Sequence, residues 1–263
     1  MRRSITSLAL TSAVFVALAS NALAGDEAHG DTTAAHQANA CAGGASADVT
    51  GGAALDGRTF TTVDRREVRL AGVDIVTDEE LAKAALAALV AGKTVHLEQV
   101  SEDRYGRTVA FAFVADASVE RTLLHHGIAV ASGRVGLKAC ADTLFVAEAE
   151  ARAARRGLWG SDSWPKSAAK PDQIAALKGR FALVEGYILS VRASGGSIYL
   201  NFAEPWWRGF SVAIARRRER AFTAAGIAPR QLQGKQIRVR GVVEMRRGPL
   251  IEATRPEQIE LSP

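Results

Sequence analysis

Long apolar runs are scarce in this sequence, and the longest lies close to its N-terminus. That run, residues 8–18, is well short of the roughly 20 apolar residues that a membrane-spanning helix needs. It follows Arg2 and Arg3 and leads to the small-residue triplet 22–24, an order typical of a cleavable secretory signal. We therefore predict a signal peptide at 1–24 and an exported mature protein, periplasmic or secreted, without a transmembrane segment. An uncleaved membrane anchor is the alternative.

Cysteine is also scarce, because the chain contains only Cys41 and Cys140. Two cysteines in an oxidising compartment can make a single intramolecular bridge. A Cys41–Cys140 disulfide would close a loop of about 100 residues and tie the N-terminal segment to the body of the protein, contributing at most roughly 4.7 kcal/mol. An intermolecular disulfide is the alternative pairing.

The net charge of +5 is distributed unevenly along the chain. Residues 25–170 contain 16 Lys and Arg against 20 Asp and Glu, a net charge of −4. Residues 171–263 contain 15 against 8, a net charge of +7. A basic segment favours a polyanionic partner, such as nucleic acid or an anionic envelope surface, although exposed arginines also serve solubility.

Two stretches without apolar periodicity divide the chain. Residues 25–45 are rich in Ala, Gly, Asp and Thr, a composition that predicts a flexible leader. Residues 161–176 begin with Ser-Asp-Ser-Trp-Pro, a composition that predicts a linker. The sequence therefore predicts two small domains, at 46–160 and 177–263.

Apolar alternation in the first of these domains predicts several strands and three helices. The strands are expected at 58–63, 67–73, 93–97 and 107–114, and two of the helices at 118–126 and 141–156. The other helix begins at Thr77 with the spacing of a capping box, ends before Gly92, and places Leu81, Ala85 and Leu89 on one face.

The second domain shows three strands, a helix and two more strands. These are expected at 181–192, 197–202, 210–215, 216–225, 235–244 and 250–254. This order matches an OB-fold, a small five-stranded barrel. The predicted fold class is therefore β-rich α+β, with two tandem five-stranded OB-type barrels of which the first carries additional helices.

Four motifs in residues 46–160 occur in the order found in one known family. They are Asp-Gly-Arg-Thr at 56–59, Val-Arg-Leu-Ala-Gly-Val-Asp at 68–74, Asp-Arg-Tyr-Gly-Arg at 103–107, and Ala-Glu-Ala-Glu-Ala-Arg at 147–152 leading to Gly-Leu-Trp at 157–159. With these motifs the segment resembles the staphylococcal-nuclease-like (thermonuclease) family. The third motif is the most specific of the four.

The resemblance implies a barrel that cleaves phosphodiester bonds of DNA and RNA with the help of calcium. It places the two phosphate-neutralising arginines of the family at Arg69 and Arg107, and a phosphate-contacting tyrosine at Tyr105. It leaves Asp56 and Asp74 as the acidic residues of the metal site. Without the resemblance, Arg69 would be read as a surface arginine and Arg107 as the partner of an aspartate across a turn.

Two positions depart from the family pattern. Arg58 stands where the family has an aspartate, and Thr77 stands where it has the carboxylate that acts on the attacking water. Calcium takes six to eight oxygen ligands, so a cation in place of a carboxylate weakens the site. Glu79 or Glu80 could replace the lost carboxylate only if the loop shifts. Calcium is the cofactor that the family implies, and these substitutions argue against it.

Aromatic and basic residues gather in the second domain. Trp206, Trp207 and Arg208 are followed by the run Arg216, Arg217 and Arg218. Aromatic side chains in a basic groove are typical of surfaces on which nucleic-acid bases stack. The alternatives are a tryptophan pair that plugs the end of a barrel and an arginine run on the exposed face of a helix.

Three functions remain open from the sequence. The first is an exported pseudoenzyme that binds nucleic acid or another phosphodiester polyanion, with metal-dependent hydrolysis reduced or lost. The second is an active secreted thermonuclease-type endonuclease with a rearranged metal site. The third, suggested by the acidic first half, is a non-enzymatic interaction module of the cell envelope.

Overall fold

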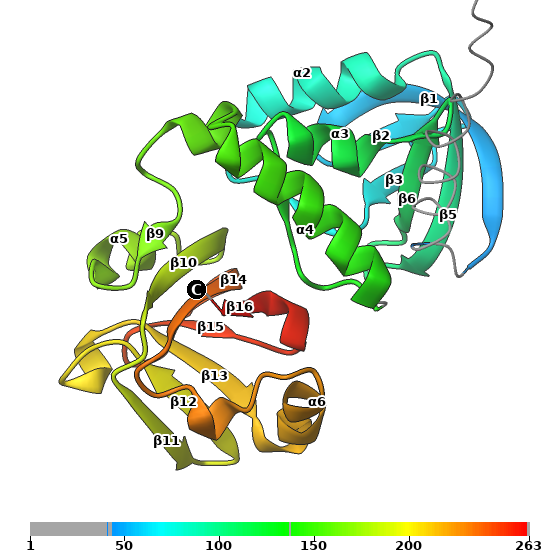
Figure 1. Ribbon diagram of the computed structural model, residues 1–263. Coiled ribbons are helices and arrows are strands. Elements are labelled where there is room, and N and C mark those ends of the chain that lie inside the picture. The colour runs from blue at the N-terminus through cyan, green and yellow to red at the C-terminus, as the bar shows by residue number, and fades with distance from the viewer. Residues whose placement is uncertain (1–40, 42–43, 137, 262–263) are drawn as a thin grey trace, which may run out of the picture.

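A computed structural model describes residues 41, 44–136 and 138–261 of the chain (Figure 1). The predicted signal peptide at 1–24 and most of the predicted leader, residues 25–40 and 42–43, lie outside the described residues. No helix among the described residues is long and apolar enough to cross a membrane.

The first sheet closes on itself. Its strands are β1 (Ser46–Asp56), β2 (Thr59–Thr62), β3 (Glu67–Leu70), β5 (Thr94–Glu102), β6 (Thr108–Val114) and β7 (Ala117–Ser118). They pair in the order β3-β2-β1-β5-β6-β7, and a parallel pairing of β3 with β6 closes five of them into a barrel. This confirms the predicted β-rich α+β fold with a five-stranded barrel. A separate pair joins β4 (Val73–Asp74) to β8 (Val130–Ala131).

No strand is predicted for residues 46–56, yet β1 occupies them. The segment is rich in glycine and alanine, so it lacks the β-branched pattern that identifies a strand. Packing explains its composition, because a Cβ added to Gly51 would lie 2.2 Å from the carbonyl oxygen of Val90. Gly51 also accepts a hydrogen bond from the backbone N–H of Gly92, at 2.8 Å. Glycine therefore lets the barrel approach the end of the neighbouring helix.

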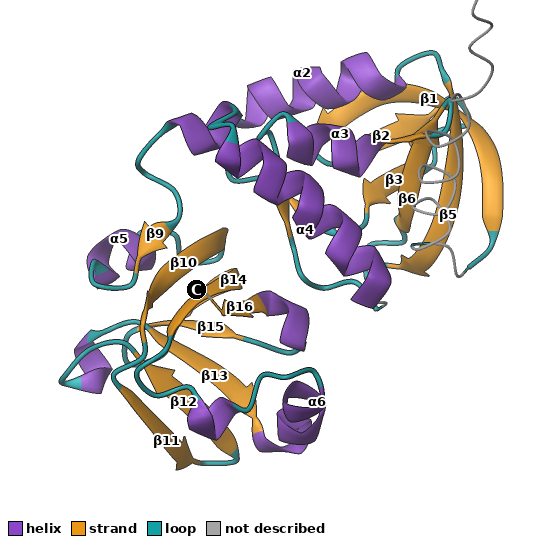
Figure 2. Cartoon of the chain, in the orientation of Figure 1, coloured by secondary structure: helices purple, strands orange, loops and turns teal. Residues whose placement is uncertain are grey.

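Three helices lie together on one side of the barrel strands (Figure 2). They are α2 (Glu79–Val90), α3 (Val119–His125) and α4 (Lys138–Ala153). Gly92, with φ +69°, follows the end of α2 as predicted. The barrel and these helices enclose one apolar core, which includes Phe60, Leu86, Phe111 and Leu123.

The start and the buried face of α2 differ from the prediction. Asp78, and not Thr77, caps the helix, and its carboxylate accepts a hydrogen bond from the backbone N–H of Leu81 at 2.9 Å. The residues buried along the helix are Ala82, Leu86 and Val90, whereas Leu81 is 57% exposed. An alanine-rich helix offers more than one apolar stripe with the same spacing, so the sequence could not fix which stripe faces the barrel.

The C-terminal part of the chain is built around a second sheet. Its elements are β9 (Lys166–Ser167), α5 (Pro171–Ala175), β10 (Phe181–Tyr187), β11 (Ser190–Ser194), β12 (Ser197–Asn201), β13 (Ser211–Ala215), α6 (Glu219–Ala224), β14 (Gln236–Met245), β15 (Pro249–Glu252) and β16 (Ile259–Leu261). The strand order is β11-β12-β13-β15-β14-β10-β9, and β16 pairs with β14. A closed second barrel stays a prediction.

Two details of this part differ from the expected elements. The strand expected at 181–192 is divided into β10 and β11, with Ile188 and Leu189 between them. The stretch predicted as a linker, 161–176, contains β9 and α5, and β9 pairs in parallel with β10. The division into domains at that stretch therefore stays a prediction.

The two parts of the chain contact each other through buried groups. A third apolar cluster takes Val130 and Trp159 from the first part and Phe181 and Leu183 from the second. Beside it the fully buried Arg240 donates hydrogen bonds to both carboxylate oxygens of Glu148, at 2.9 and 3.1 Å. An arginine without exposure needs such partners, because an unpaired buried charge is costly.

The predicted disulfide is confirmed. Cys41 and Cys140 are bonded, with their Cα atoms 4.7 Å apart. The bond joins the residues before β1 to helix α4.

Candidate functional site

The loop between β1 and β2 places Arg58 against Asp74. The Arg58 guanidinium forms an ion pair with the Asp74 carboxylate through Nη1 and Oδ1, and the same nitrogen donates to the carbonyl oxygen of Val73 at 3.4 Å. The backbone N–H of Arg58 donates to Oδ1 of Asp56 at 2.8 Å. Both aspartates expected at the metal site are therefore engaged by Arg58.

Asp74 lies on the short strand β4 and is buried, with 7% of its surface exposed. Burial raises its pKa above the ordinary value, while the guanidiniums of Arg58, Arg134 and Arg69 act in the opposite direction. Arg134 lies far from the other two in sequence, so no sequence motif pointed to it.

Arg69 is on β3, between Thr59 of β2 and Val109 of β6. Its pKa is lowered, first by burial and then by the positive charges of Arg58 and Arg107. The side chain of Arg69 forms no hydrogen bond or ion pair with any residue that the structure describes, although the negative charges of Asp74 and Asp56 raise its pKa in part. A half-buried guanidinium near two others, without a bound carboxylate, is a favourable place for an anion.

Arg107 ends the turn between β5 and β6, and Asp103 begins it. Nε of Arg107 donates to the Asp103 carboxylate at 2.8 Å, which confirms the pairing across the turn that the sequence left open. Hydrogen bonds from Arg107 lower the pKa of Asp103 to about 2. Tyr105 is 67% exposed, and the guanidinium carbons of Arg104 and Arg107 lie 4.9 and 5.1 Å from its ring centroid.

Thr77, which stands where the resemblance leads us to expect the catalytic carboxylate, donates its hydroxyl to the carbonyl oxygen of Ile128 at 3.0 Å. Glu79 comes closer to the site than its sequence position suggested. Its carboxylate accepts a hydrogen bond from the backbone N–H of Gly57 at 2.7 Å. Glu79 lines a hollow of about 390 Å³ with Arg58 and Asp74, and the C-terminal part contributes Arg180 and Phe181 to the same hollow. Nothing in the sequence indicated the last two.

These residues do not fit a calcium ion. Calcium takes six to eight oxygen ligands. Among residues 41, 44–136 and 138–261, no group of three or more His, Cys, Asp or Glu is placed to hold a metal. The Asp74 carboxylate already has a guanidinium against it, and the Asp56 carboxylate is used by the loop.

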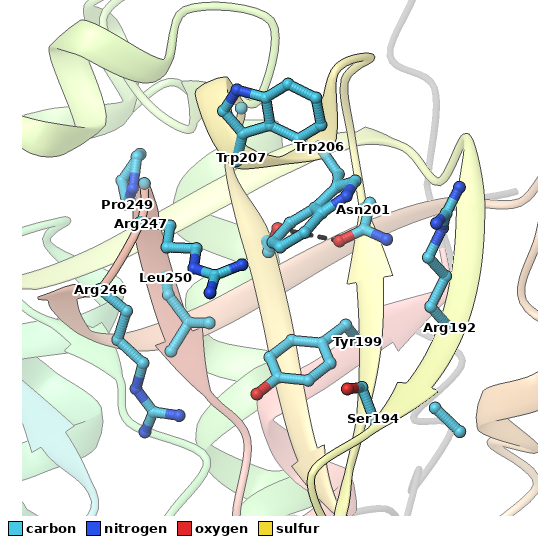
Figure 3. A pocket seen from close by; sticks show the side chains of 14 residues that line it. Arg192, Ser194, Tyr199, Asn201, Trp206, Trp207, Arg246, Arg247, Pro249 and Leu250 are labelled. Atoms are coloured by element: carbon cyan, nitrogen blue, oxygen red, sulfur yellow. Dashed lines mark hydrogen bonds between the residues drawn. The ribbon is translucent and has the colours of Figure 1, made fainter.

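The aromatic and basic residues of the C-terminal part lie at a different place. Trp206 and Trp207 belong to the short 3-10 helix η2 (Trp206–Arg208) and line a hollow of about 730 Å³ (Figure 3). Neither ring belongs to the buried cluster of this part, and Trp207 is 49% exposed. Arg208 and the run Arg216–Arg218 do not line the hollow, and all four are exposed.

Comparison with known proteins agrees with the barrel and its motifs. The profile of the family described as staphylococcal nuclease homologue matches residues 67–161. Protein ParB of Escherichia coli is 34% identical over 121 residues, an alignment that covers 40% of this chain and 68% of that protein. The chain belongs to the family of staphylococcal nuclease homologues.

Proposed function

We propose that this protein is exported, periplasmic or secreted, and binds nucleic acid or another phosphodiester polyanion with its metal-dependent hydrolysis reduced or lost. The binding face consists of Arg69, Arg107 and Tyr105. The observation that carries the proposal is the contrast between two arginine side chains: Arg58 forms an ion pair with Asp74, whereas the side chain of Arg69 forms no hydrogen bond or ion pair with a described residue.

Binding follows from the charges on this face. Burial lowers the pKa of Arg69 most, and the nearby charges of Arg58 and Arg107 lower it further. A phosphate diester would offset both effects, because its negative charge pairs with the guanidinium. Arg107 is held by Asp103, so its direction is fixed before a ligand arrives. Tyr105 is exposed beside it and supplies a ring and a hydroxyl to the same ligand.

Hydrolysis of a phosphodiester requires catalytic groups in addition to those that bind it. The transition state of phosphodiester cleavage needs stabilising charge and also an activated water. Arg58 can offset the charge of a bound phosphate, but lowering the pKa of a water requires a coordinated cation. Thr77 has no carboxylate to act as a base, and Asp56 and Asp74 are engaged by Arg58.

The binding claim is tested by fluorescence anisotropy with labelled single-stranded and double-stranded DNA in the presence of a chelator. We expect Arg69→Ala to weaken binding about tenfold, since a charge-assisted phosphate contact contributes roughly 1.5–3 kcal/mol. Arg220→Ala removes an exposed arginine from α6, with the same change in net charge, and should leave the affinity unchanged. Equal affinities of the Arg69→Ala variant and the native protein would contradict the proposed face.

One observation supports an active endonuclease with a rearranged site as the second candidate. The Glu79 carboxylate lies at the Arg58 loop, where it accepts the N–H of Gly57. If Glu79 acts on water, chelator-sensitive DNA cleavage should be present in the native protein and absent from Glu79→Gln. If the native protein does not cleave DNA with calcium, magnesium or manganese, this candidate is eliminated.

A further inference from the structure

The hollow of about 730 Å³ in the C-terminal part has the composition of a ligand site. Pockets that bind small molecules have volumes of roughly 300–1,000 Å³. Its walls come from β11, β12, η2, β13, β15 and the loop between β14 and β15. The side chains that give it its chemistry are Arg192, Tyr199, Trp206, Trp207, Arg246 and Arg247. Among the described residues that line it, none is Asp or Glu.

Aromatic rings form one wall of this hollow. The rings of Trp206 and Trp207 are nearly perpendicular, with centroids 5.7 Å apart, and Trp207 is 49% exposed. Figure 3 shows the ring of Trp206 above that of Tyr199, with the side chain of Asn201 beside the indole. Apolar rings held at a surface leave area in water that a flat ligand could cover. Planar bases stack on such rings whatever their sequence.

Unpaired cations flank the rings. Arg192 and Arg247 are exposed and form no ion pair with a described residue. Figure 3 shows them on opposite sides of Tyr199, and the guanidinium carbon of Arg247 lies 5.7 Å from the ring centroid of Trp206. Arg246 differs, because Glu244 and Glu252 each lie 3.4 Å from its Nη2. The charge available to a ligand therefore comes from Arg192 and Arg247.

We propose that this hollow binds nucleoside phosphate units, with the base against Trp206 and Tyr199 and the phosphates against Arg192 and Arg247. A guanidinium recognises phosphate oxygens through paired hydrogen bonds. The two arginines reach the hollow from different elements, Arg192 from β11 and Arg247 from the loop between β14 and β15. A single-stranded nucleic acid and a free nucleotide both present this chemistry. The proposal does not rest on the Arg69 face.

The test measures binding of the full chain to labelled oligodeoxythymidylate of about 12 nucleotides, a length within the range of small single-strand sites, at several salt concentrations. ATP and thymidine monophosphate serve as unlabelled competitors, and a chelator is present throughout. The variants are Trp206→Ala, Trp206→Phe and the double change Arg192→Ala/Arg247→Ala. The double change Lys170→Ala/Arg220→Ala is the control, since it removes the same charge from two exposed residues that do not line the hollow.

We expect Trp206→Ala to weaken oligonucleotide binding at least about fivefold, whereas Trp206→Phe keeps a stacking ring and stays within about twofold of the native protein. The pocket double variant should reduce the slope of log K against log salt by about 1.4, because each phosphate contact contributes roughly 0.7 on single strands. The control double variant should keep both the affinity and the slope.

The competitors identify the source of the ligand. Displacement by ATP or by thymidine monophosphate assigns the hollow to free nucleotides, and its absence assigns the hollow to a strand. The proposal is overturned if neither kind of ligand binds. It is overturned as well if Trp206→Ala and Arg192→Ala/Arg247→Ala both bind the oligonucleotide as tightly as the native protein does. It is also overturned if the control loses as much affinity as the pocket variant. Arg69→Ala is measured in parallel to separate the two sites. A loss of affinity in Arg69→Ala alone supports only the Arg69 face, and a loss in the variants of the hollow alone supports only the hollow.

Discussion

At the scale of single residues, the ion pair between Arg58 and Asp74 determines what the barrel can hold. The side chain of Asp74 is 10% exposed and that of Arg58 is 26% exposed, so the pair is only partly screened by water. A carboxylate at position 58 would turn this pair into two neighbouring acids, which repel each other unless a cation joins them.

We predict that Arg58→Asp gains a response to calcium that the native protein lacks. Without calcium the variant should be less stable than the native protein by about 2 kcal/mol, somewhat less than the loss of a partner costs in a fully buried pair. Adding calcium should raise its thermal midpoint, because a ligand that binds only the folded state stabilises it. Arg58→Ala controls for loss of the pair alone. A calcium shift of equal size in the native protein would contradict the prediction.

Glu120 is a second residue whose ionisation is set by the fold. It is fully buried on α3, and desolvation raises its pKa to about 8, although it accepts hydrogen bonds from the N–H of Ala112 and the hydroxyl of Ser118. The folded protein therefore keeps a proton that the unfolded chain releases above the ordinary pKa of 4.5. Between those two values stability falls as the pH rises.

We predict that Glu120→Gln removes this dependence. The contribution of the native Glu120 should decline by about 1.4 kcal/mol per pH unit across the window. Urea unfolding of both proteins at about pH 5.5 and about pH 7.5 gives the change in the free energy of unfolding with pH for each protein. The difference between the two changes belongs to Glu120, because the other titrating groups are common to both proteins. Parallel pH profiles for the two proteins would show that Glu120 titrates at an ordinary pKa.

At the scale of elements, the sequence predicts the helix ends and turns that are specified by a short run of neighbouring residues. The end of α2 at Gly92 and the turn from Asp103 to Arg107 follow from short motifs, and the structure confirms both. Strand β1 was not predicted, because its glycines allow close contact with α2 and a tertiary contact of this kind leaves no local sequence pattern. The choice of Asp78 over Thr77 as the cap likewise depends on a tertiary bond, that of Thr77 to Ile128.

The disulfide joins two of these elements, and we predict that it stabilises the fold mainly through the unfolded chain. It closes a sequence separation of 99 residues. Replacing both cysteines with serine should lower the free energy of unfolding by up to roughly 4.7 kcal/mol. Native protein unfolded with a reductant should match the variant. Two reactive thiols in the native protein would show that the bond is not formed.

At the scale of the whole molecule, the junction between the two parts depends on Arg240 and Glu148, which are 92 residues apart. Arg240 also donates to the carbonyl oxygen of Ala131 at 2.8 Å, so it binds two separate segments of the first part. Nothing local in the sequence relates these residues. For the same reason Arg180 and Arg134 could not be assigned to the candidate site from the sequence, whereas Arg58, Arg69 and Arg107 could, since each lies in a family motif.

We predict that Arg240→Ala destabilises the protein by about 3 kcal/mol, because it removes the fully buried cation from the Glu148 carboxylate and leaves only the Arg152 guanidinium beside it, at 3.4 Å. The double change Arg240→Met/Glu148→Leu should cost less than the single change, since it removes both charges. Urea unfolding of the three proteins measures the difference. If the single variant is as stable as the native protein, Arg240 does not secure the junction.

The central claim is that this nuclease-family barrel binds phosphodiesters and does not turn them over at a nuclease's rate. The most direct measurement follows one labelled DNA in one sample, by anisotropy for binding and by gel for cleavage, with calcium, magnesium or manganese and then with a chelator. We predict salt-sensitive binding that persists in the chelator, with cleavage weak or absent under every condition. Rapid, chelator-sensitive cleavage that disappears in Arg107→Ala would contradict the claim.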